Sequence, residues 1–141
     1  MSLSQKTVII VKATATPVAE NAEAITKRMY EILFENYPET KLLFQNADLD
    51  QHKKLAGAVS AYAANIDNLE VLAKAVEKMA ATHVATSVKP EHYPMVGVSL
   101  LAAVKDVLGE AATDEVLKAW KEAYFFLADI LIRREKELYA A

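Results

Sequence analysis

The chain has 141 residues, of which 53% are hydrophobic and 25% are charged, and its formal net charge at pH 7 is -3. These values are typical of one soluble globular domain with a sizeable core, and they argue against a disordered chain. The slightly acidic balance excludes the basic footprint of a nucleic-acid-binding protein. The absence of cysteine excludes a disulfide framework and a thiolate metal site. A chain without cysteine suits a reducing cytosol, so we expect a cytoplasmic protein. No apolar stretch is long enough to span a membrane and no signal peptide is visible.

Apolar residues recur at offsets of three and four along the first half of the chain, which predicts amphipathic helices. A first helix carries the apolar positions of 8–18, and Pro17 is expected to bend it. A second helix carries the aromatic and apolar face of 30–37, and Pro38 follows that face. After a polar segment, a third helix follows the stripe of 51–66.

The second half of the chain continues the helical pattern. One stripe covers 72–83 and ends at a histidine. The next helix is expected to have Pro94 at its first position and Gly109 just past its end, where these residue types are favoured. Thr113 is placed to cap the last helix, whose stripe continues to Leu138. The chain is therefore predicted to be all-α, with about six to seven helices and no strand.

Four polar side chains occupy stripe positions where a core residue is expected. They are Tyr30, Gln51, His83 and Glu135, each on a different predicted helix. Each alone is compatible with a satisfied polar residue at the edge of a core, because an inward polar group is costly unless it finds a partner. Four of them on four helices indicate an interior polar site. In such a site a neutral imidazole could bind a metal, and the other groups could support it.

His83 is the best metal ligand among these residues. A zinc site needs about three or four protein ligands, and the chain contains neither His-Glu-x-x-His nor a cluster of carboxylates. A lone histidine suits a metal that brings its other ligands, as the iron of haem does with four porphyrin nitrogens. An all-helical domain with one inward histidine therefore points to a haem protein, with His83 as the axial ligand.

Five stretches of the chain are similar to segments of one known family, and together they extend over nearly its whole length. They are "YEILFENYPETKLLF" (30–44), "NIDNLEVLAKAVEKMAATH" (65–83), "KPEHYPMVG" (89–97), "VLKAWKEAY" (116–124) and "REKELY" (134–139). On these stretches the chain resembles the single-domain bacterial haemoglobins and the globin domain of flavohaemoglobins. The resemblance implies a globin fold around a b-type haem. It also implies one globin domain over 1–141 and no reductase domain.

The resemblance assigns roles to residues at matching positions. His83 is similar to the proximal iron ligand, and Tyr93 and Glu135 are similar to the pair that hydrogen-bonds around it. Tyr30 and Gln51 are similar to the distal residues that contact the gas. The resemblance thus places these tyrosines, the glutamine and the glutamate in the reactive site. The expected haem contacts, besides the histidine, are Phe44, Leu55, Met79 and Val96.

The polar segment before Gln51 departs from the common pattern, because it is a few residues shorter than in typical flavohaemoglobins. His52 directly follows Gln51. If the helix started one residue differently, His52 could face the iron and ligate it. Gln51 fits the inward stripe better, since Leu55 lies four residues further on. Both registers stay open at this level.

Three functions are compatible with the sequence. The first is reversible binding of O2, and also of NO and CO, at a five-coordinate haem iron, for oxygen storage or delivery or for protection against NO. The second is nitric oxide dioxygenation, which would need a separate reductase because no G-x-G-x-x-G motif occurs in the chain. The third is a cofactor-free helical interaction or sensor module. The resemblance also allows a homodimer, which no feature of the sequence requires.

Overall fold

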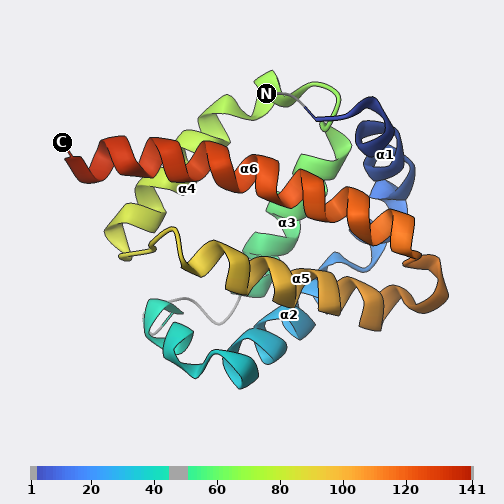
Figure 1. Cartoon of the computed structure of the whole chain (residues 1–141), viewed down its shortest axis with the longest axis horizontal. Coiled ribbons are helices and arrows are strands. Elements are labelled where there is room, and N and C mark those ends of the chain that lie inside the picture. Colours follow the sequence, from blue (N-terminus) through green and yellow to red (C-terminus); the bar gives the residue numbers. More distant parts are fainter. Residues whose placement is uncertain (1–2, 45–50, 141) are drawn as a thin grey trace.

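Six α-helices form the body of the protein, as Figure 1 shows in a computed structural model that describes residues 3–44 and 51–140. They are α1 Gln5–Glu20, α2 Ala22–Asn36, α3 Gln51–Ala64, α4 Ala73–Ala85, α5 His92–Leu108 and α6 Asp114–Ala140. Three short 3-10 helices lie between them: η1 Pro38–Phe44, η2 Leu69–Leu72 and η3 Gly109–Ala111. These described ranges contain no strand, so the all-α prediction is confirmed. In the same ranges every helix is too short or too polar to pass through a bilayer.

Local sequence signals explain where α5 ends and where α6 begins. Thr113 caps α6 as expected, because its Oγ1 accepts a hydrogen bond from the N–H of Val116 at 3.2 Å. Gly109 follows α5 with φ 58°, a conformation that glycine adopts without strain. α5 begins at His92, two residues before the expected start at Pro94. Proline is tolerated there because the first turn of a helix leaves its N–H groups without intrahelical partners.

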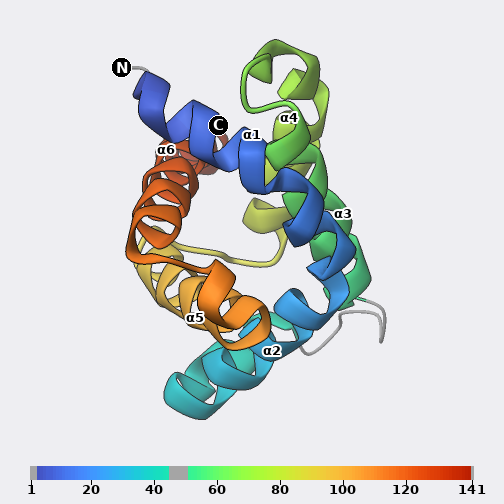
Figure 2. The same ribbon diagram turned by 90° about the vertical axis from the view of Figure 1, so that its right-hand side faces the viewer.

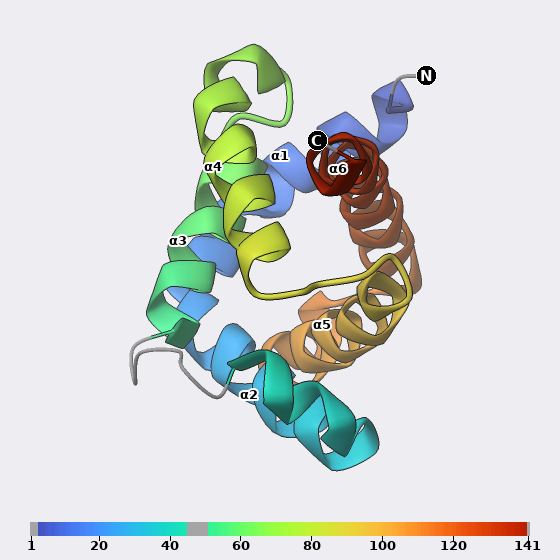
Figure 3. The same cartoon turned by 90° about the vertical axis from the view of Figure 1, so that its left-hand side faces the viewer.

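The helices form two groups that face each other. Figure 3 shows α3 and α4 on one side and α5 and α6 on the other, with α2 across one end. Figure 2 shows α1 crossing from one group to the other. Pro17, which was expected to bend α1, lies in its last turn, and the chain turns at Asn21. α6 packs on α1, α4 and α5, so it connects the helix that carries His83 with the rest of the molecule.

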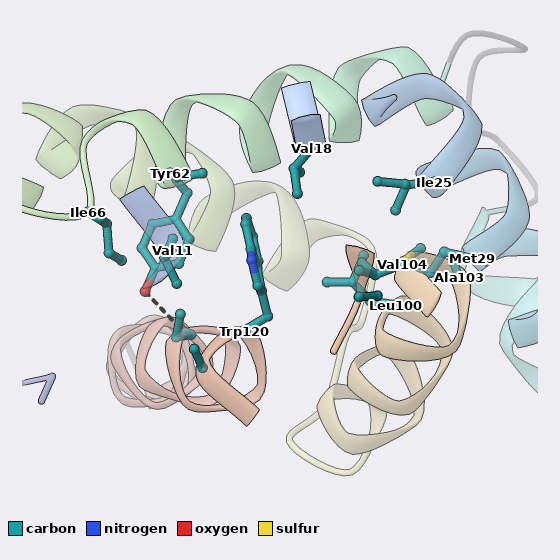
Figure 4. Close-up of a cluster of buried hydrophobic side chains, with 14 of the residues drawn as sticks. Val11, Val18, Ile25, Met29, Tyr62, Ile66, Leu100, Ala103, Val104 and Trp120 are labelled. Atoms are coloured by element: carbon teal, nitrogen blue, oxygen red, sulfur yellow. Dashed lines mark hydrogen bonds between the residues drawn. The ribbon is translucent and has the colours of Figure 1, made fainter. Parts of the chain in front are cut away.

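Most buried apolar side chains form one cluster between α1, α2, α3, α5 and α6, shown in Figure 4. Its fully buried members include Val11, Val18, Ile25 and Met29. Trp120 of α6 extends this cluster to α1, where its Nε1 donates to Oγ1 of Thr14 at 2.9 Å. The cluster thus joins the first two helices to the last two.

A second, smaller cluster lies between α4, α5 and α6. Its buried members are Ala80, Tyr93, Ala128 and Leu131. Ala80 is fully buried and faces α6, where its small side chain allows the two helices to approach closely. This cluster surrounds the region in which His83, Tyr93 and Glu135 meet.

The alkaline stability of the fold should depend on Tyr62, whose hydroxyl donates to the carbonyl oxygen of Ala123 at 2.7 Å (Figure 4). Burial raises the pKa of Tyr62 far above its ordinary value of about 10. The unfolded chain therefore releases this proton near pH 10 while the folded chain keeps it, so the stabilisation is present below that pH and is lost above it. Above about pH 10 the free energy of unfolding of the wild type should therefore decrease with pH. In Tyr62→Phe, which lacks this proton, we expect the decrease to be smaller by roughly 1.4 kcal/mol per pH unit. Urea unfolding at a series of alkaline pH values measures both slopes, and equal slopes would contradict this expectation.

The close approach of α5 to α6 at Gly97 gives a second prediction. A Cβ at this position would lie 2.7 Å from Cε2 of Tyr124, whose ring is held because its hydroxyl donates to the carbonyl of Tyr93 at 2.6 Å. Gly97→Ala should therefore lower the free energy of unfolding by about 1–3 kcal/mol. Gly57→Ala is the matched control: apart from its chain neighbours and the backbone of its own helix, no described atom lies within 4 Å of its added Cβ. It should raise the free energy of unfolding by about 0.5–1 kcal/mol. Chemical denaturation compares the two variants, and effects of the same sign would contradict this account.

Candidate functional site

His83 lies near the end of α4, two residues before Ala85. Its carbonyl oxygen accepts hydrogen bonds from the N–H of Val88 at 2.9 Å and from Oγ1 of Thr86 at 3.2 Å. Ser87, with φ 66°, turns the chain between these two residues. This compact turn fixes the backbone of His83, whose side chain is 28% exposed.

Three helices bring His83, Tyr93 and Glu135 together, which is the arrangement that the family resemblance implies. Nδ1 of His83 lies 2.9 Å from the hydroxyl oxygen of Tyr93 and 3.0 Å from Oε2 of Glu135. The hydroxyl of Tyr93 also donates to the carboxylate of Glu135, with distances of 2.7 Å to Oε2 and 2.9 Å to Oε1. The three side chains therefore form a closed triangle of hydrogen bonds between α4, α5 and α6.

The donors and acceptors of this triangle determine which nitrogen of His83 carries the proton. A carboxylate only accepts, so the single hydroxyl proton of Tyr93 goes to Glu135. The oxygen of Tyr93 and the carboxylate of Glu135 are then both acceptors that face Nδ1 of His83. Nδ1 must therefore carry the proton, and Nε2 of the neutral ring keeps its lone pair. This is the tautomer that a metal-binding imidazole needs.

Glu135 and Tyr93 form the buried part of the triangle, with 3% and 7% of their surfaces exposed. A buried carboxylate is costly unless donors surround it, and Tyr93 and His83 provide those donors. Burial raises the pKa of Tyr93, and its hydrogen bond to Glu135 raises this pKa further. The phenol therefore stays protonated and remains a donor over the whole physiological range.

Tyr124 is a supporting residue that the sequence analysis missed. Its hydroxyl donates to the carbonyl oxygen of Tyr93 at 2.6 Å, and burial raises the pKa of Tyr124. The ring packs edge-on against Phe125, with 5.1 Å between the centroids. In the sequence Tyr124 occupies an ordinary apolar stripe position of the last helix, so its spacing gave no sign of a polar role.

A group of three aromatic side chains contains two of the predicted site residues. Tyr30 and Phe34 of α2 lie near Phe44 of η1, with ring centroids 5.2–5.7 Å apart. All three rings are half-buried. The structure therefore brings Tyr30 and Phe44 together through an edge contact between their rings, and their roles in one site stay a prediction.

The other expected contact residues are on α3, α4 and α5. Leu55 and Val96 are half-buried and pack against the main cluster, and Met79 is half-buried and packs against the smaller one. The side chain of Gln51 lies outside the described part of the chain, as does the segment 45–50 that precedes it.

His52, the alternative ligand, is half-buried in the first turn of α3. Its carbonyl oxygen accepts a hydrogen bond from Oγ1 of Thr26 at 2.7 Å. Thr26 is fully buried on α2, so this bond ties the start of α3 to its neighbour. The choice between Gln51 and His52 as the inward residue stays a prediction.

The donor set for a metal is small in the part of the chain that the structure describes. Within residues 3–44 and 51–140, no three or more His, Cys, Asp or Glu side chains gather in a way that would hold a metal ion. The hydrogen-bonded triangle offers a metal one imidazole nitrogen, Nε2 of His83. Such a site suits a metal centre that carries its remaining ligands with it.

Comparisons with known proteins agree with this arrangement. A family model described as Globin matches residues 27–131. The chain is 54% identical over 140 residues to a flavohaemoprotein of Rhodopirellula baltica, a match that covers 97% of this chain and 34% of that protein. It is 51% identical over 138 residues to an uncharacterised globin-like protein of Aquifex aeolicus, with 98% of each chain covered. The chain thus spans about a third of the length of the flavohaemoprotein and nearly all of the globin-like protein.

A solved structure shows the same architecture. It is an engineered carbene transferase made from a provisionally named nitric oxide dioxygenase of Rhodothermus marinus. The two chains superpose with a TM-score of 0.93 at 42% identity, over 99% of this chain and 97% of that one. The expected globin fold and the resemblance to bacterial globins and flavohaemoprotein globin domains are therefore confirmed. On the family match and on these identities, the chain belongs to the globin family.

Proposed function

We propose that the chain is a haem protein that reversibly binds O2, and also NO and CO, with His83 as the single axial protein ligand. The geometry around His83 carries this proposal: Nδ1 faces the hydroxyl of Tyr93 at 2.9 Å and the carboxylate of Glu135 at 3.0 Å. These two acceptors leave Nε2 as the nitrogen with a lone pair for a metal. Oxygen storage, oxygen delivery or protection against NO are the roles that such binding would serve.

The residues present fit a haem group. The donor set is one neutral imidazole, and a haem iron needs only one or two further ligands beyond its porphyrin nitrogens. Half-buried apolar side chains from four elements are available to cover a porphyrin. They are Phe44 of η1, Leu55 of α3, Met79 of α4 and Val96 of α5. We assign these four residues as haem contacts.

The side chains of this site hold and polarise the axial ligand. When bound, haem supplies an iron that takes up diatomic gases. The imidazole of His83 becomes more basic because its Nδ1–H donates to Glu135 and Tyr93. We assign the hydroxyl of Tyr30 and the amide of Gln51 as hydrogen-bond donors to the gas. A buried hydrogen bond of this kind is worth about 1–3 kcal/mol.

The finer parts of the proposal are of two origins. A b-type haem, a single globin domain over 1–141 and a possible homodimer come from the family resemblance, and a cytoplasmic location comes from the cysteine-free composition. A separate reductase is expected as the electron donor. Each of these points stays a prediction.

The visible absorption spectrum of the purified chain, reduced and free of oxygen after addition of haem, tests the proposal. We expect a five-coordinate ferrous spectrum for the wild type and its loss in His83→Ala, because the axial nitrogen is removed. His52→Ala is the matched control, since it removes another half-buried imidazole and should keep the spectrum. An absent haem band in the wild type would contradict the proposal and favour a cofactor-free interaction module. A six-coordinate wild type that becomes five-coordinate in His52→Ala would identify His52 as a second ligand.

A second function, nitric oxide dioxygenation, is favoured by the known proteins that this chain resembles. They include a flavohaemoprotein and a protein made from a provisionally named nitric oxide dioxygenase. In this reaction one O2, one NO and one electron give one nitrate ion. The electron would come from the separate reductase. A strongly donating imidazole, as the triangle around His83 provides, suits this chemistry because it pushes electron density toward the iron.

Sustained turnover separates these two functions. With excess NADH and a flavin reductase, the dioxygenase function predicts many nitrate ions for each protein molecule, and about one when the reductase is left out. Glu135→Gln should slow turnover by about 10- to 100-fold, because the support of the axial imidazole is weakened. A nitrate assay on aliquots measures both effects. A yield of one nitrate for each protein molecule in the presence of the reductase would reject the enzymatic function and leave gas binding.

A further inference from the structure

α4, the helix that bears His83, is held to the rest of the molecule chiefly by α6. Ala80 is the only described side chain of α4 that is fully buried. The main packing partners of α4 are α6 and the preceding η2. Figure 1 shows the C-terminal half of α6 running across α4. The orientation of the imidazole therefore depends on how α6 holds this helix.

Arg134 of α6 binds α4 on one side of the triangle. Its Nη2 donates to Oε1 of Glu77 at 2.7 Å, and its Nε donates to Oε2 of the same carboxylate at 3.0 Å. A two-point bond between a guanidinium and a carboxylate fixes orientation as well as distance. Nη1 of Arg134 also donates to Glu137 at 2.8 Å, which holds the guanidinium in place from its own helix.

Tyr139 of α6 binds the segment that follows α4, on the other side of the triangle. Its hydroxyl donates to the carbonyl oxygen of Val88 at 2.7 Å. The ammonium of Lys89 lies 4.3 Å from the centroid of the Tyr139 ring, within the range of a cation–π contact. Val88 also donates its N–H to the carbonyl of His83, so Tyr139 is one residue removed from the backbone of the axial histidine.

The contacts follow the same order along α6 as along α4 and the turn after it. Arg134, Glu135 and Tyr139 follow one another on α6, and they hold Glu77, His83 and Val88 in that order. Glu77 and His83 are six residues apart, or about 9 Å along the axis of α4. Two attachments at this separation restrict both the sliding and the rotation of α4 on α6, and the third attachment fixes the turn after it.

We propose that Arg134 and Tyr139 are positioning residues, which hold α4 and the following turn on α6 so that Nδ1 of His83 stays within hydrogen-bond distance of Glu135 and Tyr93. This inference rests on the proposed function, in which His83 is the axial ligand. The Arg134–Glu77 pair is 38% and 53% exposed, so salt screens it more than the buried bonds of the triangle. The support of the axial imidazole therefore weakens as ionic strength rises.

The iron–histidine stretching frequency of the reduced, haem-loaded protein tests this inference, because it reports the hydrogen bond at Nδ1. Arg134→Gln and Tyr139→Phe should each lower the frequency. Glu77→Gln should lower the frequency as Arg134→Gln does. The Arg134→Gln/Glu77→Gln double variant should lower it no further, because each of the three removes the bond between Arg134 and Glu77. Arg28→Gln is the matched control: Arg28 donates to Asp106 at 3.0 Å and ties α2 to α5, away from His83. It should leave the frequency unchanged.

The outcomes separate the inference from the proposed function. Wild-type frequencies in Arg134→Gln and Tyr139→Phe, with a lowered frequency in Glu135→Gln, would overturn the positioning role and leave haem binding intact. A wild type that binds no haem would overturn the proposed function. Amide hydrogen exchange on the haem-free protein would then decide the positioning role. Exchange in α4 should be roughly two- to fivefold faster in Arg134→Gln than in Arg28→Gln, and equal rates would overturn the inference.

Discussion

The buried carboxylate of Glu135 is the constraint on which the site depends. Water cannot solvate a group with 3% of its surface exposed, so the protein itself must provide donors. Tyr93 and His83 provide them from two other helices. Removal of either donor would leave the carboxylate with one partner, and the loss of a hydrogen bond to a charged group would cost about 1.5–3 kcal/mol. The same carboxylate decides the tautomer of His83, so one buried group both joins three helices and leaves Nε2 of His83 with its lone pair.

The parts of the fold and site that followed from the sequence are those with a local physical cause. The stripes through His83 and Glu135 place both residues on inward faces, and the structure brings both side chains together. Gly109 and Thr113 mark helix ends because backbone conformation and capping act within a few residues. The haem hypothesis followed from one inward histidine without further protein ligands, which is a matter of coordination chemistry.

The parts that did not follow depend on contacts between distant segments. Periodicity assigns Tyr124 to an inward face, but it does not say that the carbonyl of Tyr93 lies opposite its hydroxyl. The bond between Arg134 and Glu77 joins residues 57 positions apart, and both look like ordinary surface charges in the sequence. The start of α5 was misplaced because His92 stabilises the preceding turn by accepting a hydrogen bond from the N–H of Lys89.

The sparse packing of α4 affects how readily the protein unfolds locally and is degraded. A helix with one fully buried side chain exposes little apolar surface when it opens, so its local unfolding costs less than unfolding of the whole chain. The segment that carries His83 is then more open to proteases than the well-packed helices of the described chain. Opening of this segment would also make a path for haem, which is too wide to pass between closed helices. Because a group that binds only the closed form stabilises it, occupancy and resistance to degradation would rise together, and cells would retain the loaded chain in preference to the empty one.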